Sequence, residues 1–112
     1  MADAAAQLRA EFNGDRGDIG YISEPYYGQP YPTQALAPEA FRYGRARIPA
    51  SDLQRRLPDA LYTLESRELC FGCDHETYLA VERMQKQYRE FVALCARKEK
   101  ESGIPCMIVV NR

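Results

Sequence analysis

The hydrophobic positions between residues 74 and 102 follow a helical repeat. Spacings of four and three residues alternate at Thr77, Val81, Met84, Tyr88, Phe91 and Cys95. This spacing places the six side chains on one face of an α-helix. Asp74 can cap the start of the helix, and Gly103 followed by Pro105 is typical of a helix end. We therefore predict a long amphipathic helix over residues 74–102.

The rest of the pattern predicts shorter elements. The continuous apolar run 106–110 indicates a strand buried on both faces, and the β-branched and aromatic residues of 60–64 indicate another strand. The alanine-rich residues 1–12 predict a short helix. A capping-box spacing at Ser51 opens a second short helix, which Pro58 is expected to end within two turns.

The strands at 60–64 and 106–110 flank the long helix, so we expect a right-handed βαβ crossover. Because two parallel strands do not form a stable sheet, the remaining strands must come from the N-terminal half or from another chain. The predicted fold class is α+β, a small single domain with one long amphipathic helix packed on a short sheet.

An N-terminal arm rich in tyrosine and proline is expected to precede this unit. Residues 20–44 hold five of the eight tyrosines together with four prolines. Proline disfavours helical geometry in the residue before it, so the segment should run extended. We divide the chain into residues 1–49, the N-terminal helix and arm, and residues 50–112, a compact α+β unit. The arm either wraps its own domain or clasps a neighbouring subunit.

Basic and aromatic residues alternate in the stretch 41–47, a pattern also found in proteins that bind single-stranded nucleic acid. Three arginines are too few for that function, so a solvated or subunit-facing stretch is favoured. The candidate partner-binding residues are Tyr21, Tyr26, Tyr27, Tyr31, Phe41, Arg42 and Tyr43.

Charge and hydropathy narrow the possible partners of this 112-residue chain. Its 15 basic and 16 acidic residues leave no cationic excess for phosphate backbones or anionic lipid, so neither nucleic acid nor a membrane is expected. No apolar run reaches the roughly 20 residues of a membrane span, and the first residues do not resemble a signal peptide. We expect a cytoplasmic or virion-associated protein, and the preference for arginine over lysine is compatible with a bacterial or phage genome.

The four cysteines fall into two pairs. Cys73 and Cys95 are 22 residues apart, which corresponds to about 33 Å along a helix, so all four cannot share one zinc ion. Cys70, Cys73 and His75 remain as a candidate zinc site that lacks a fourth ligand. Similar heights along helix and strand should bring Cys95 and Cys106 together in the core.

The Cys70-Phe71-Gly72-Cys73 turn also fits a redox dithiol, because a helix start lowers the pKa of a thiol. Over residues 60–102, the expected strand, turn and helix resemble the first strand, turn and helix of thioredoxin-like proteins. The resemblance implies that Cys70 attacks and Cys73 resolves. The chain departs from that family because it ends where the fold needs a further strand, a hairpin and a helix.

The sequence contains no nucleophile triad, paired-carboxylate site or phosphate-binding glycine loop, and no small-molecule substrate is evident. It favours a non-enzymatic assembly or interaction protein, a small component of a larger complex such as a phage virion, or a host-interaction protein. Its expected partner is another protein or further copies of the chain, with no cofactor. The alternative is an accessory protein in which the Cys70–Cys73 turn performs thiol–disulfide chemistry or binds zinc.

Overall fold

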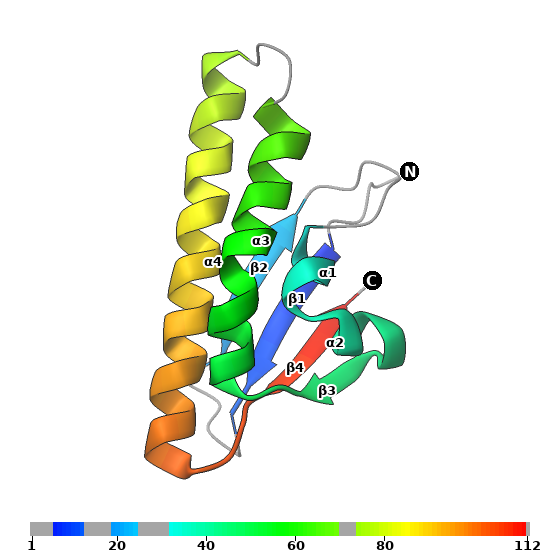
Figure 1. Cartoon of the computed structure of the whole chain (residues 1–112), viewed down its shortest axis with the longest axis vertical. Coiled ribbons are helices and arrows are strands. Elements are labelled where there is room, and N and C mark those ends of the chain that lie inside the picture. The colour runs from blue at the N-terminus through cyan, green and yellow to red at the C-terminus, as the bar shows by residue number, and fades with distance from the viewer. Residues whose placement is uncertain (1–5, 13–18, 25–31, 70–73, 112) are drawn as a thin grey trace.

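The computed structural model describes residues 6–12, 19–24, 32–69 and 74–111. These residues form a small α+β domain in which helices cover one face of a four-stranded antiparallel sheet (Figure 1). The strand order is β2-β1-β4-β3. The strands are β1 (Ala6–Glu11), β2 (Gly20–Glu24), β3 (Arg45–Arg47) and β4 (Met107–Asn111). The helices are α1 (Thr33–Leu36), α2 (Pro38–Tyr43), α3 (Ala50–Leu69) and α4 (His75–Ser102). The predicted fold class is confirmed.

Helix α4 forms as the hydrophobic repeat predicts. The Asp74 carboxylate accepts a hydrogen bond from the backbone N–H of Thr77 at 2.8 Å, which caps the first turn. Gly103 ends the helix in the left-handed conformation that glycine adopts without strain. Strand β4 also forms where the apolar run predicts it. No helix among the described residues is long and apolar enough to cross a lipid bilayer.

Strand β1 corrects the helix expected at residues 1–12. Residues 7–11 alternate polar and apolar side chains, and β1 pairs with β2 on one side and β4 on the other. The alternation puts Leu8 and Ala10 in the core and leaves Arg9 on the other face of the sheet. Pairing and burial therefore override the helix propensity of alanine.

Helix α3 corrects two expectations at once, because residues 60–64 are helical and Pro58 does not end the helix. The buried residues Leu53, Ala60 and Leu64 lie at helical spacing and form part of the core. The Glu99 carboxylate of α4 accepts a hydrogen bond from the Ala50 backbone N–H at 2.8 Å. This contact joins the start of α3 to the end of α4.

The arm is not extended throughout, which corrects a third expectation. Residues 33–36 and 38–43 are helical. Pro38 occupies the first turn of α2, where its missing N–H has no helical partner to lose. Arg56 of α3 holds this segment on the domain, since its guanidinium donates two 2.8 Å hydrogen bonds to the Glu39 carboxylate and a third to the Leu36 carbonyl.

The sheet is completed within the chain, and every pairing in it is antiparallel. The expected βαβ crossover is therefore wrong, because helix α3 and not a strand comes before α4 in the chain, and β4 pairs antiparallel with both of its neighbours. The segment before residue 50 supplies three of the four strands, β1, β2 and β3, and the segment after it supplies β4. The missing strands thus come from the N-terminal half rather than from a second chain.

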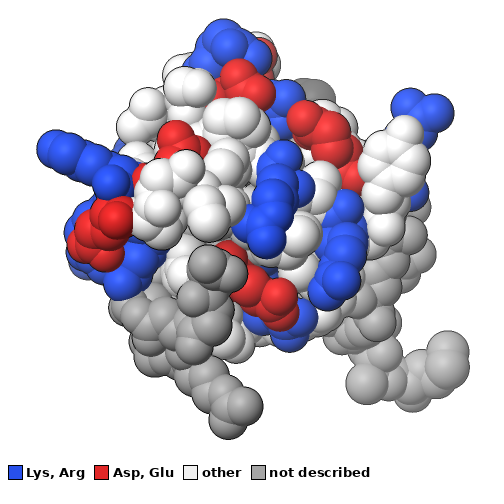
Figure 2. Space-filling model, turned by 90° about the horizontal axis from the view of Figure 1, so that it is seen from below, with Lys and Arg blue, Asp and Glu red and all other residues white. Residues whose placement is uncertain are grey.

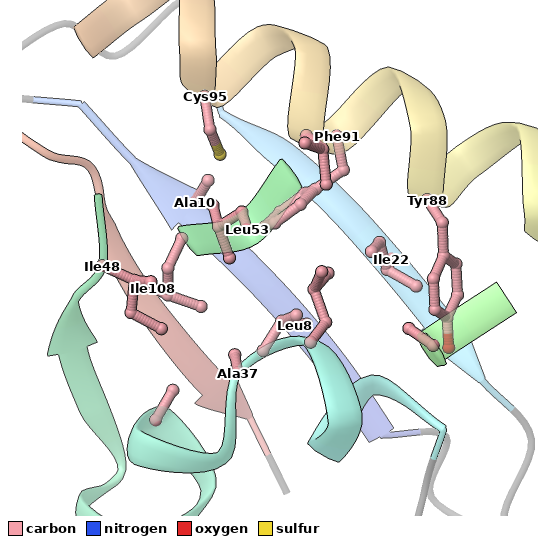
Figure 3. Close-up of a cluster of buried hydrophobic side chains, with 14 of the residues drawn as sticks. Leu8, Ala10, Ile22, Ala37, Ile48, Leu53, Tyr88, Phe91, Cys95 and Ile108 are labelled. Atoms are coloured by element: carbon pink, nitrogen blue, oxygen red, sulfur yellow. The ribbon is translucent and has the colours of Figure 1, made fainter. Parts of the chain in front are cut away.

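The core lies between the sheet and the helices. Leu8, Ile22 and Ile108 point from the strands toward Phe91 and Cys95 of α4 (Figure 3). Gly20 permits the close approach of α4 to β2, since a Cβ there would lie 2.9 Å from the Leu94 Cδ2 atom. The opposite side of the sheet carries no helix (Figure 1).

Candidate protein-binding face

Only some of the predicted partner-binding residues are on the described surface. Tyr21 of β2 is 44% exposed and Tyr43 at the end of α2 is 67% exposed. The Arg42 guanidinium lies 5.4 Å from the centre of the Tyr43 ring, a cation–π distance. Phe41 is a core residue at 8% exposed. Tyr26, Tyr27 and Tyr31 lie outside the described residues.

The helix-free side of the sheet, called the outer face below, is defined by the residues that alternate with the core positions. These residues are Gln7, Arg9, Glu11, Tyr21, Ser23, Arg45, Arg47, Met107, Val109 and Asn111. Tyr21 therefore belongs to a larger surface that sequence reasoning did not assemble.

The strand register arranges part of this face into one row. Tyr21 pairs with Arg9, Arg9 with Val109, and Val109 with Arg45. At about 4.8 Å between strands, the row spans roughly 14 Å across the sheet. Side chains that face one another across strands lie close enough to form one contact surface.

The outer face has an excess of positive charge. Apart from Tyr21, its described ionisable residues are Arg9, Arg45, Arg47 and Glu11. The Arg9 guanidinium forms an ion pair with the Glu11 carboxylate at 2.6 Å. Arg47 donates to the Pro105 carbonyl at 2.8 Å. Neither Arg45 nor Arg47 forms an ion pair with a carboxylate in the described part of the chain. In the described structure, these two guanidinium groups therefore have no carboxylate ion-pair partner.

The sheet ends near a part of the molecule with mixed charge. Figure 2 views the end where α4 turns back toward β4, and basic side chains stand there beside acidic and uncharged surface. Lys98 and Glu101, both near the end of α4, pair at 3.5 Å. Arg45 and Arg47 of the outer face differ from Lys98, because they form no ion pair with a carboxylate of the described residues.

The candidate zinc site is only partly described. His75 is the first residue of α4 and is exposed, while Cys70 and Cys73 lie outside the described residues. The rest of the described chain holds no cluster of three residues suited to bind a metal ion. The thioredoxin-like resemblance loses its first element, because residues 60–64 belong to α3.

The second cysteine pair meets as predicted. Cys95 and Cys106 are both buried, and the Cys106 thiol donates to the Cys95 carbonyl at 3.6 Å. Cys95 lies inside α4, about two turns before its end, and Cys106 directly precedes β4.

Sequence reasoning missed that Arg9, Arg45 and the buried Val109 belong to one face of the sheet. The alternation at 45–47 and at 7–11 was a signal for strands, but only the pairing partners show that the two stretches share a face. Comparison of the chain with models of protein families, with curated proteins and with solved structures found no match.

Proposed function

We propose that this protein works by binding a protein partner through the outer face of its sheet, as a non-enzymatic assembly or interaction component. The observation that carries the proposal is the row of Tyr21, Arg9, Val109 and Arg45 across all four strands. The row combines the exposed aromatic ring of Tyr21 with guanidinium groups on the face that no described helix covers, while Val109 in the same row is only 9% exposed.

The composition of this face supports binding rather than simple solvation. An antiparallel sheet can expose one face to water, and such a face is ordinarily polar. Here the exposed Tyr21 and the half-buried Met107 accompany the arginines. Tyrosine, methionine and arginine are enriched in protein interfaces, where lysine and aspartate are depleted. Tyrosine and arginine are also the residues that most often dominate binding energy.

The charge of the face indicates an acidic partner. Arg45 and Arg47 lack carboxylate partners in the described structure, so an acidic segment can supply them. Two copies placed outer face to outer face would bring their arginines together, which disfavours that homodimer. Arg42 and Tyr43 precede β3 in the chain, and both are exposed.

Selection from a random peptide library on the immobilised chain tests this proposal. We expect the selected peptides to be enriched in Asp and Glu. The double variant Arg45→Glu with Arg47→Glu should weaken their binding at least tenfold, because it places like charges opposite the peptide. Higher salt should weaken binding to the unmodified chain.

The matched control is Arg83→Glu with Arg89→Glu, which changes the net charge equally on the exposed side of α4. It should retain binding, and urea unfolding should show that both double variants are folded. Equal losses in the two variants, or selected peptides without acidic enrichment, would contradict the proposal. Tighter binding of a single-stranded oligonucleotide than of the peptides to the same arginines would indicate a nucleic-acid partner instead.

A further inference from the structure

A second feature lies at the junction of α4 and β4, apart from the row that carries the proposed function. Cys95 is 1% exposed and Cys106 is 4% exposed, and the Cys106 thiol contacts the Cys95 backbone at 3.6 Å. Each thiol also shifts the pKa of the other, so the two side chains lie close together. Ten residues, 96–105, separate them in the chain.

A pocket of about 190 Å³ reaches Cys106 from the surface. Cys106 forms part of its wall, together with Phe12, Arg47, Lys98, Glu101, Ser102, Ile104 and Pro105. At about 30 Å³ for each water molecule, the pocket has room for roughly six. The pocket can therefore admit a small polar reagent, but it is too small for a peptide-sized disulfide such as glutathione disulfide.

The surroundings distinguish the two thiols. The hydrogen bond from Cys95 lowers the pKa of Cys106, as does the nearby Arg47 charge, while burial and the Glu99 charge oppose the shift. The same hydrogen bond to Cys106 and burial raise the pKa of Cys95. Cys106 therefore loses its proton first, and it is also the cysteine in the pocket wall. A thiolate is the form of cysteine that attacks.

We propose that Cys95 and Cys106 form an oxidisable dithiol that a small hydroperoxide converts into a disulfide. The Cys106 thiolate attacks one oxygen of the hydroperoxide, so that an S–O bond forms, the O–O bond breaks and an alcohol or water leaves after taking a proton. Cys106 is then a sulfenic acid. Cys95 attacks this sulfur, the S–S bond forms, and the hydroxyl leaves as water with the Cys95 proton. The two thiols are oxidised by two electrons and the hydroperoxide is reduced by two.

The test uses the full-length chain with Cys70→Ser and Cys73→Ser, so that only the buried pair can react. Hydrogen peroxide is the probe, and peptide mass mapping without reductant is the measurement. We expect a Cys95–Cys106 disulfide with a loss of 2 Da, reversed by dithiothreitol, at peroxide concentrations that leave the methionines unmodified. The same bond should form in the chain that keeps all four cysteines.

The variants separate the two steps. With Cys95→Ser, Cys106 should accumulate as a sulfenic acid that dimedone labels. With Cys106→Ser, Cys95 should stay a thiol over the same time. Labelling of Cys95 instead would reverse the assigned roles and overturn the mechanism.

Formation of the disulfide in the folded chain, with Cys95 and Cys106 unmutated, decides whether the proposal holds. If Cys95 and Cys106 both remain reduced in the folded chain while a peroxide-sensitive reporter thiol in the same solution is oxidised, the pair is structural and the proposal fails. A disulfide that forms only after urea unfolds the chain would fail it equally.

Discussion

At the scale of single residues, neighbours in a strand have opposite environments, and this alternation separates core from candidate site. Leu8 lies in the core, whereas Arg9 belongs to the outer face. The amphipathic repeat of α4 could be predicted from sequence because its spacing involves only local residues. The sequence could not predict that Arg9 and Arg45 lie in one row, because their positions depend on which strands pair and in which register.

Phe91 is the residue that tests the core most directly. It is buried against the sheet, so Phe91→Ala should reduce the free energy of unfolding by about 3–5 kcal/mol through lost burial and a cavity. Urea denaturation monitored by circular dichroism measures this change. Tyr88→Phe is the control: the Tyr88 hydroxyl has no hydrogen-bond partner within the described structure, so its removal should change stability by less than about 1 kcal/mol. A loss below about 1 kcal/mol for Phe91→Ala would contradict the described core.

Glu39 gives the fold a defined pH dependence. The hydrogen bond from Arg56 lowers the pKa of the Glu39 carboxyl below its ordinary value of 4.5. A lowered folded pKa means that this contribution is fully present above pH 4.5 and is lost as the pH falls through the folded value. Glu39→Gln should therefore be less stable than the unmodified chain at pH 7, and the difference should shrink below pH 4.5.

Urea midpoints from pH 7 to pH 3 measure that difference. Because both chains keep every other carboxylate, their comparison isolates Glu39. A difference that stays constant over this range would show that the Arg56 contact does not couple to protonation.

At the scale of elements, the predictions succeeded where the local pattern and the tertiary requirement agree, as in α4 and β4. They failed where the two conflict. In α3, Pro58 and the β-branched content favoured a break, but the helical spacing of Leu53, Ala60 and Leu64 decided the structure. In β1, alanine favoured a helix, but pairing with β2 and β4 decided it.

Pro58 inside α3 should weaken the domain. Proline lacks the N–H that would bond within the helix, and its ring crowds the preceding turn. Because Pro58 is exposed, Pro58→Ala should stabilise the fold, by up to about 3 kcal/mol, with a higher melting temperature. Pro49→Ala is the matched control and should change stability by less than about 0.5 kcal/mol, since Pro49 precedes the helix. Destabilisation by Pro58→Ala would contradict an uninterrupted α3.

At the scale of the whole molecule, residues near both ends of the chain build one sheet, with β1 between β2 and β4. This long-range pairing removes the need for a strand from another chain, which was the physical reason for expecting an assembly partner from the sequence. The case for a partner rests instead on the outer face. This face carries no helix because the four described helices lie on the opposite side of the sheet (Figure 1).

Amide chemical-shift mapping with a selected acidic peptide tests this central claim most directly. The account predicts that the largest shifts fall on the row at Tyr21, Arg9, Val109 and Arg45, with little change in the buried Leu53 and Leu64 of α3. Shifts confined to the helices, with the strand amides unchanged under saturating peptide, would contradict a binding function for the outer face.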